Sequence, residues 1–318
     1  MKIRPFIASY PTHLKLVALL LIIFVCMLFT SILAYVVGTL VFGSNVMLQM
    51  SDPANYAQPV VLRALKIFQL LSQMGVFILP VVIFALFASD KPLAYLNLNS
   101  KSKILLFLLS VLAILPALPL INWLAEVNSH MHLPAALNGI EEWMKKSETE
   151  AAGLTNSFLL SNTWPGFLVN ILMMAIIPAL GEELLFRGLL IRLFRDWTKD
   201  IHVAIFISAF IFSAIHMQFY GFFARLMMGV MFGYLLYWTG SIWVPVLVHF
   251  INNAIIVSCG FATARGYTQL NPDTFGSTDN IAVLIGCALI FTLMFATIFR
   301  MRQKSVPFST EGESGEKE

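Results

Sequence analysis

The sequence predicts an all-α membrane protein, a bundle of about eight transmembrane helices that encloses a polar intramembrane cavity. Of its 318 residues, 58% are hydrophobic and only 12% are charged. Soluble chains carry about a quarter charged residues, so we expect lipid to surround most of this one. Eight apolar runs follow one another, and a few ionisable residues lie inside them. The net charge of +3 is small and indicates no nucleic-acid partner.

The first apolar run, Leu16–Phe42, has about 27 uncharged residues, enough to span a bilayer with some tilt. It is too long for a signal peptide and has no small-residue cleavage site, so we expect a retained first helix. Counted from this first run, the fifth and seventh of the eight runs are the shortest. The later runs are Gln69–Ala88, Ile104–Ala125, Pro165–Leu190, Val203–Met217, Phe222–Trp238, Trp243–Ser258 and Ile281–Phe299.

The distribution of Lys and Arg predicts the orientation in the cell membrane. Eight spans place both termini on one side, and the side with more basic residues is cytoplasmic. The basic residues on the side of the termini are Lys2, Arg4, Lys15, Lys91, Lys101, Lys103, Arg192, Arg195, Lys199, Arg300, Arg302, Lys304 and Lys317. The other side has Arg63, Lys66, Lys145, Lys146 and Arg265. We therefore expect a multi-pass protein of the plasma membrane with both termini in the cytoplasm.

The run PALGEELLFRGLL places Glu182, Glu183 and Arg187 inside a membrane span. Arg192 is expected to begin the cytosolic turn, so Glu182 lies about 15 Å away along the helix, near the middle of the bilayer. A charge there costs roughly 2.5–3.5 kcal/mol, so pairing is expected. Glu183 and Arg187 are four residues apart on one helix face, whereas Glu182 has no local partner. A structural ion pair explains Glu183 and Arg187 but leaves Glu182 free to act as a general base.

Two later spans carry further polar residues. FSAIH places His216 deep in the fifth helix, and HFINN places His249 and Asn253 four apart on one face of the seventh. A lone intramembrane His is more often an interhelical hydrogen-bonding residue than a catalyst. Together with Glu182, these residues on three helices favour a chemical site.

The three segments EELLFR, FSAIH and HFINN, in this order on successive apolar helices, resemble the E-E-x-x-x-R, F-x-x-x-H and H-x-x-x-N/D motifs of the CPBP family. This family comprises the type II CAAX prenyl proteases and the bacteriocin-processing and immunity relatives, which are intramembrane endopeptidases. The resemblance covers roughly Trp164 to Val257. It implies that Glu182 activates the hydrolytic water, supported by Glu183 and Arg187. It also implies that His216 helps to hold the water, and that His249 and Asn253 face the developing oxyanion.

The apolar runs and the resemblance together divide the chain into four parts. Residues 1–163 form three transmembrane helices and an outer amphipathic segment, and residues 164–258 form the catalytic core. Residues 259–303 form a loop and the last transmembrane helix, and residues 304–318 form a disordered polar tail. The amphipathic segment, about residues 133–159, is expected either to lie on the outer membrane face or to be a solvated helical loop.

A peptide or protein at the membrane is the substrate implied by the resemblance. A metal route stays open as well, because Glu182, His216 and His249 could form a two-His, one-carboxylate zinc site. No H-E-x-x-H motif favours zinc over a metal-free glutamate mechanism. Two other functions remain as alternatives: a non-proteolytic immunity or scaffold protein, and a proton-coupled transporter, since intramembrane Glu and His also mark proton relays.

Overall fold

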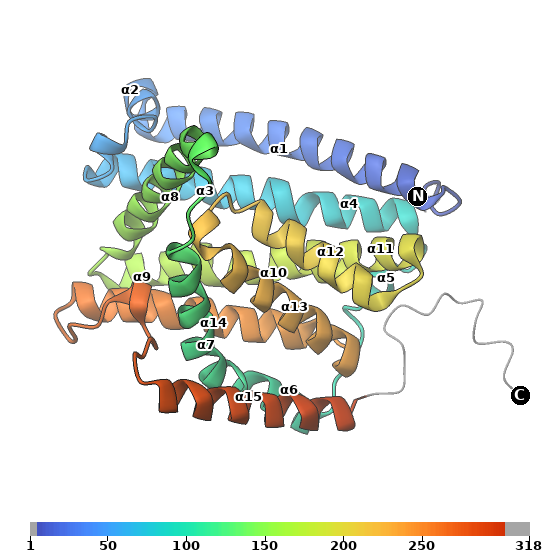
Figure 1. Cartoon of the computed structure of the whole chain (residues 1–318). Helices are drawn as coiled ribbons and strands as arrows, with labels where there is room; N and C mark the ends of the chain where they lie inside the picture. Colours follow the sequence, from blue (N-terminus) through green and yellow to red (C-terminus); the bar gives the residue numbers. More distant parts are fainter. Residues whose placement is uncertain (1–4, 303–318) are drawn as a thin grey trace, which may run out of the picture.

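The computed structural model describes residues 5–302, and helices joined by short connections make up nearly all of this range (Figure 1). The residues described contain no β-strand, which confirms the predicted all-α class. The predicted tail, residues 304–318, and the basic residues Lys2, Arg4, Lys304 and Lys317 lie outside this range.

Several membrane spans are built from consecutive helical segments, so the bounds are given segment by segment. The α-helices are α1 (Thr12–Phe42), α2 (Ser44–Gln49), α3 (Pro59–Gln73), α4 (Leu79–Ala88), α5 (Pro92–Tyr95), α6 (Ile104–Leu112), α7 (Ile114–Ser129), α8 (Asn138–Leu159), α9 (Trp164–Asn170), α10 (Ile177–Glu183), α11 (Ile191–Thr198), α12 (Ile201–Ala214), α13 (Phe222–Thr239), α14 (Trp243–Ala264) and α15 (Ile281–Arg300). Three segments are π-helical: η2 (Met74–Ile78), η4 (Ile171–Ile176) and η5 (Leu184–Leu190). Four short turns are 3₁₀-helical: η1 (Pro53–Asn55), η3 (Ala135–Leu137), η6 (Phe219–Gly221) and η7 (Pro272–Thr274).

Within residues 5–302, seven helices are long and apolar enough to cross a membrane. The remaining predicted span, the fifth, corresponds to α12, which has only 14 residues. It is about 21 Å long, whereas the hydrocarbon layer is about 30 Å thick. A count of eight full spans is therefore not confirmed. The start of α1 and the end of α15 nevertheless lie on the same side of the bundle (Figure 1).

Two predicted ends of spans are wrong, in both cases where charged residues follow or precede an apolar run. The second span begins at Pro59, ten residues before Gln69, and the fourth continues to Thr198 instead of ending at Leu190. Arg192 does not begin a turn. It is only 8% exposed, and its guanidinium carbon lies 4.5 Å from the centroid of the Tyr95 ring. This contact keeps the side chain inside the fold, so the helix continues past it.

The short helix α12 starts and ends at defined polar contacts. The Asp200 carboxylate accepts hydrogen bonds from the backbone N–H groups of His202 and Val203, which begins the helix. The backbone N–H groups of Val203 and His202 also lower the pKa of Asp200. At the other end, Met217 adopts a left-handed conformation, with φ of 53°, and the helix cannot continue. The chain therefore turns back after a helix that is shorter than the hydrocarbon layer is thick.

Helices α12 and α13 pack at close range. A Cβ atom added to Gly229 would lie 2.8 Å from the Cβ of Ala209 on α12, so no larger residue fits between the two helices. Gly233, four residues later, lies equally close to Ile205. This contact agrees with the small-residue pattern of α13, because glycines at this spacing let two helix backbones approach.

The amphipathic segment forms the helix α8, which lies obliquely at the end of the bundle opposite the start of α1 (Figure 1). Its buried face includes Phe158 and Leu159, while Glu142, Lys146 and Glu150 are exposed. A helix with these two faces can cover the bundle end and still face water or lipid headgroups. The position of α8 relative to the membrane surface stays a prediction.

The three π-helical segments all lie beside the polar residues of the fourth span. Pro80 and Pro178 follow η2 and η4 within a few residues and have no backbone N–H to donate to the preceding turn. A π-helical turn accommodates such an interruption without ending the helix, and π-turns are frequent at functional sites. The wide turns therefore mark the region where the bundle opens into a cavity.

Candidate active site

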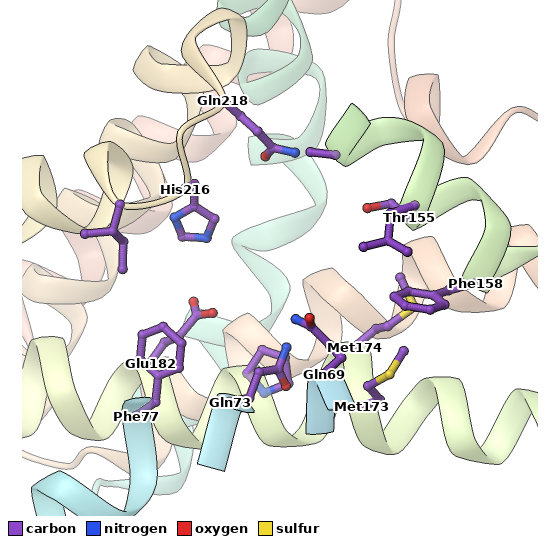
Figure 2. A pocket seen from close by; sticks show the side chains of 14 residues that line it. Gln69, Gln73, Phe77, Thr155, Phe158, Met173, Met174, Glu182, His216 and Gln218 are labelled. Carbon is purple, nitrogen blue, oxygen red and sulfur yellow. The ribbon is translucent and has the colours of Figure 1, made fainter. Parts of the chain in front are cut away.

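A cavity of about 430 Å³ lies between α3, α8, α10 and the turn that follows α12 (Figure 2). Its wall contains one carboxylate, one imidazole and several neutral amide and hydroxyl groups among apolar side chains. The lining residues are Gln69, Gln73, Phe77, Ala151, Leu154, Thr155, Phe158, Met173, Met174, Pro178, Glu182, Ile215, His216 and Gln218. The cavity reaches Glu182, which is 18 residues after the start of its 35-residue span and so lies about 27 Å along it.

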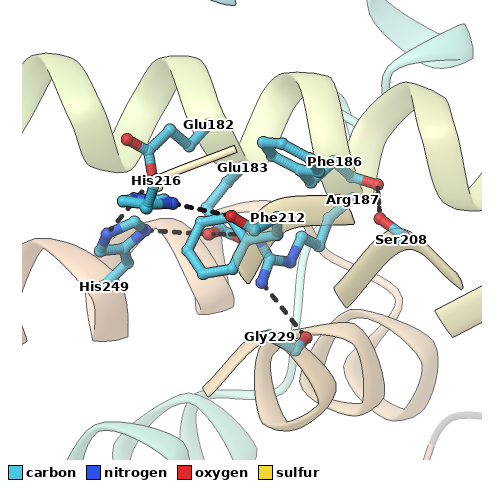
Figure 3. A network of polar contacts seen from close by, with 9 residues as sticks. All are labelled: Glu182, Glu183, Phe186, Arg187, Ser208, Phe212, His216, Gly229 and His249. Carbon is cyan, nitrogen blue, oxygen red and sulfur yellow. Dashed lines mark hydrogen bonds and ion pairs between the residues drawn. The ribbon is translucent and has the colours of Figure 1, made fainter. Parts of the chain in front are cut away.

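Behind the cavity, Glu183 and Arg187 form the ion pair that their spacing predicted. Arg187 Nη1 lies 3.0 Å from Glu183 Oε1, and the two side chains are 1% and 0% exposed. Arg187 Nη2 donates a hydrogen bond of 3.2 Å to the carbonyl of Gly229 on α13 (Figure 3). The guanidinium carbon also lies 4.6 Å from the Phe212 ring centroid and 5.2 Å from that of Phe232. The pair therefore joins α10 and η5 to α12 and α13.

His249 connects this ion pair to Glu182 (Figure 3). Its Nδ1 lies 2.9 Å from Glu183 Oε1, and its Nε2 lies 3.9 Å from Glu182 Oε2. The ring stacks on Phe232, with centroids 5.2 Å apart and planes inclined by 26°. A carboxylate oxygen can only accept a hydrogen bond here, so Nδ1–H of His249 donates to Glu183. This bond sets the tautomer and the orientation of the ring, and Nε2 faces Glu182.

Glu182 is placed differently from Glu183. It lines the cavity, and its carboxylate accepts no hydrogen bond from any residue between 5 and 302. Its only ion-pair contact in this range is the 3.9 Å approach to His249, which is longer than a hydrogen bond. A water molecule bound between the two groups would satisfy both. Glu182 is thus the acid group that is open to the cavity, and Glu183 the one that is closed off from it.

His216 lies across the cavity from Glu182, as Figure 2 shows. It is not deep in a helix, as predicted, but in the turn two residues after the end of α12. Its Nδ1 lies 2.7 Å from the carbonyl oxygen of Phe212, one of the last carbonyls of that helix. Nδ1 therefore carries the hydrogen, and Nε2 is left to bind a water or a substrate group. Because α12 is short, its end reaches the depth of Glu182.

The turn that carries His216 is held from two sides. The backbone N–H of Tyr220 donates to Glu148 Oε2 on α8 at 2.9 Å. Arg225 of α13 donates to the side-chain oxygen of Gln218 at 2.9 Å and also to the backbone carbonyl of Gln218. These contacts fix the turn relative to α8 and α13, and with it the position of the His216 ring.

Asn253 is the candidate residue that the structure does not bring into contact with the others. It lies one turn after His249 on α14, and its Oδ1 accepts a hydrogen bond of 3.2 Å from Asn252. It does not line the cavity, and no hydrogen bond joins it to Glu182, His216 or His249 in the described part of the chain. The predicted role beside an oxyanion stays a prediction.

The zinc site considered from the sequence is not supported by the arrangement of donors. Among residues 5–302, no group of three or more His, Cys, Asp and Glu side chains is arranged to hold a metal ion. Glu182, His216 and His249 lie around the site without forming such a group. We therefore derive no step through a metal.

Sequence reasoning missed four residues that the structure places around the cavity. Gln69 and Gln73 line it from α3, while Glu148 and Arg225 hold the His216 turn. The two glutamines are four residues apart inside an apolar run, which is a detectable signal, because amides are seldom placed in a membrane span without a partner or a role. The contacts of Glu148 and Arg225 depend on chain reversals that spacing alone does not indicate.

Residues 164–255 match the family model described as type II CAAX prenyl endopeptidase Rce1-like. No curated protein and no solved structure matches the chain. The match runs from the start of α9 through α13 into the first part of α14, and the matched residues include all six candidate residues. It confirms the resemblance to the CPBP family of intramembrane endopeptidases that the three motifs predicted.

Proposed function

We propose that this chain, a CPBP-family intramembrane endopeptidase by its match to the Rce1-like family, hydrolyses a peptide bond with a water molecule activated by Glu182. The main support for this proposal is that the two adjacent carboxylates have different surroundings. Glu183 is fully buried and engaged by Arg187 and His249, whereas Glu182 faces the cavity without a hydrogen bond from the described residues.

The proposed first step is attack of water on the carbonyl carbon of the scissile bond. Water binds between the Glu182 carboxylate and His216 Nε2, and Glu182 takes one proton as the new C–O bond forms. The carbonyl π electrons move to oxygen, and the resulting oxyanion accepts a hydrogen bond from Nε2–H of a His249 ring that is protonated on both nitrogens. Glu183 stabilises that protonated ring through Nδ1, which is 2.9 Å away.

The second step is breakage of the C–N bond. The electron pair of the bond goes to the leaving nitrogen, which takes the proton that Glu182 received from water. A lone pair of the oxyanion re-forms the C=O bond at the same time. Glu182 returns to a carboxylate, and a carboxylic acid and an amine are released. Water and the peptide are the only reactants, and Glu182 both receives and returns the proton.

The orientation predicted from the basic residues is part of the proposal. The ends of α4, α11 and α15 lie on the same side of the bundle as the start of α1, and α8 lies at the opposite side (Figure 1). Lys91, Lys199 and Arg302 therefore lie on the side of the chain ends, which agrees with a cytoplasmic location of that side. The cavity, which α8 lines, would then face the outer half of the plasma membrane.

The test compares membranes from cells that carry the wild-type chain, the Glu182→Gln variant or the control Glu150→Gln. Glutamine keeps the volume of Glu182 and removes the base, and Glu150 is an exposed residue of α8 outside the cavity. We expect one or more precursors to accumulate with Glu182→Gln only, and cleavage of the same precursor by the purified wild type to persist in a metal chelator. A phenotype that survives Glu182→Gln would favour the scaffold alternative. Proton-coupled flux into vesicles without any cleaved product would favour a transporter.

A further inference from the structure

Gln69 and Gln73 lie on the cavity-facing side of α3, and Figure 2 shows their amides reaching into the cavity beside Glu182. The Oε1 atom of Gln73 is buried and has no hydrogen-bond partner among the residues described. Leaving a buried polar group unpaired is costly, so such an atom is usually satisfied by a bound molecule. Neither glutamine has a role in the hydrolysis derived above.

The spacing of the two glutamines matches the repeat of an extended peptide. Residues four apart on a helix are displaced by about 6 Å along its axis. In an extended chain, residues two apart are displaced by about 6.6 Å and present their N–H and C=O groups to the same edge. A primary amide offers both an acceptor and donors, so each glutamine can bind the N–H and C=O of one residue.

We infer that Gln69 and Gln73 form a substrate-positioning strip that binds the backbone of an extended peptide at two alternate residues, next to Glu182. The inference rests on the proposed function and specifies how the substrate lies. A peptide that enters the cavity loses water from its backbone groups, and each unpaired group carries a free-energy cost. The strip supplies replacement partners, and because the amides are uncharged they do not compete with Glu182 for the proton.

The π-helical segment η2, which follows the two glutamines, helps to position them. Gln73 is the last residue of α3, and η2 begins at Met74. Gly181 of α10 lies against η2, and a Cβ atom added there would approach the Cβ of Phe77 to 2.8 Å. The close approach of the two helices places the end of α3 next to the turn that carries Glu182. The glutamines are thus positioned by backbone packing, since neither side chain hydrogen-bonds to another residue between 5 and 302.

The experiment uses the full chain in lipid nanodiscs and a library of synthetic decapeptides, with products identified by mass spectrometry. The peptide that the wild type cuts fastest, and that Glu182→Gln leaves intact, is resynthesised with single backbone esters. An ester removes one N–H donor without adding bulk. We expect esters at two positions, two residues apart, to lower kcat/KM about three- to tenfold, and the ester between them to have little effect.

The variants Gln73→Met and Gln69→Met assign the two positions, and Gln58→Met, before the start of α3 and outside the cavity, is the matched control. On the parent peptide, each cavity variant should have kcat/KM lowered by the same factor that one ester lowers it for the wild type. When that variant acts on the peptide carrying that ester, kcat/KM should not fall any further. This non-additivity would not arise from a merely structural role.

Two unfavourable results are distinguishable. If the wild type cuts no peptide that Glu182→Gln leaves intact, the proposed function fails and the strip fails with it. The other result is Glu182-dependent cleavage in which the ester effects fail to alternate along the peptide, or combine multiplicatively with the effects of the glutamine variants. Either pattern would show that the strip alone is wrong. The ester series on the wild type decides this even if a glutamine variant does not fold.

Discussion

His249 Nδ1 and Glu183 Oε1 are 2.9 Å apart, and the same carboxylate oxygen lies 3.0 Å from Arg187. One buried carboxylate therefore both neutralises a buried guanidinium and orients the imidazole that faces Glu182. The two adjacent carboxylates therefore have different roles, one structural and one chemical. Glu183 holds the helices and the ring in place, and Glu182 remains available to the cavity.

We expect Glu183→Gln to destabilise the protein by about 3–5 kcal/mol, because it leaves the Arg187 charge buried without a partner. Glu182→Gln should have a much smaller effect, since its carboxylate is bonded to no described residue. Unfolding of the purified variants in detergent micelles, followed by circular dichroism, measures the difference. The double variant Glu183→Leu with Arg187→Met should recover much of the lost stability. Equal losses for Glu182→Gln and Glu183→Gln would contradict this assignment.

His249→Gln should lower kcat by about 10²–10³, the usual cost of removing one donor to an oxyanion. KM should change little, because the ring interacts strongly with the substrate oxygen only when negative charge develops on it in the transition state. Single-turnover kinetics with an excess of enzyme separates the chemical step from binding. A variant that loses affinity but keeps kcat would show that His249 contacts the bound substrate instead of the developing charge.

Gly181→Ala should destabilise the protein by about 1–3 kcal/mol and lower Glu182-dependent cleavage, because the new methyl group meets Phe77 and forces α10 and η2 apart. Gly286→Ala is the matched control. It lies within α15, with nothing within 4 Å of its added Cβ, so it should stabilise the helix slightly. Thermal unfolding and cleavage assays of both variants check the contrast. A harmless Gly181→Ala would show that the two segments can separate freely.

Glu148→Gln should loosen the turn that carries His216 and lower kcat/KM severalfold while leaving global unfolding nearly unchanged. The carboxylate accepts the N–H of Tyr220 at 2.9 Å, and a neutral amide oxygen is a weaker acceptor. Hydrogen exchange of the turn, read by mass spectrometry, should rise in this variant. Glu142→Gln, an exposed residue of the same helix, should show neither effect. Faster exchange without any loss of activity would mean that the position of His216 is not critical.

Glu141 predicts a pH dependence of the segment before and within α8. Hydrogen bonds from His132 and Lys145, with one from the backbone of Leu133, lower the pKa of Glu141 to about 2 from its ordinary 4.5. Because the folded pKa is depressed, the stabilisation is present above about pH 4.5 and is lost as the pH falls from there to about 2. Hydrogen exchange around Leu133 should therefore differ between wild type and Glu141→Gln above this window, and the difference should vanish at its acid end.

Glu150→Gln serves as the control for this pH series. Its carboxylate lies 4.0 Å from Lys146 with both groups exposed, so the pair should contribute little at any pH. A difference between wild type and Glu141→Gln that persists at pH 2 would mean that the segment is held by contacts other than this carboxylate.

The membrane spans were predictable because a lipid environment requires apolar side chains. An apolar composition is visible in the sequence without knowledge of any tertiary contact. Their ends were less predictable wherever a charged side chain finds a partner inside the fold. Arg192 stacks on Tyr95, and Lys66 donates a hydrogen bond of 2.7 Å to Asn170. Both pairs join residues far apart in the chain, so the sequence pattern marks these positions as water-exposed when they are not.

The site shows the same division. The Glu183–Arg187 pair follows from a spacing of four on one helix, and the structure contains it. The contact of His249 with Glu183 bridges 66 positions of the sequence and could be expected only from the family motifs. The depth of His216 could not be judged, because it depends on where α12 ends, and that is decided by the backbone of Met217.

The wide turns at η2, η4 and η5 have a consequence for tolerated changes in length. A π-helical turn contains one residue more than an α-helical turn needs, so deleting a residue there would restore a regular helix. Because the extra residue belongs to the wide turn, the residues that follow would keep nearly the same orientation relative to the preceding ones, whereas a deletion in a regular α-helix would rotate them by about 100°. Loss of one residue in η5 should thus leave Arg192 facing its present neighbours, while loss of one residue in α13 should turn the rest of that helix away from its own. Deletions in the three π-helical segments should therefore disturb assembly of the bundle less than deletions in the α-helical segments beside them.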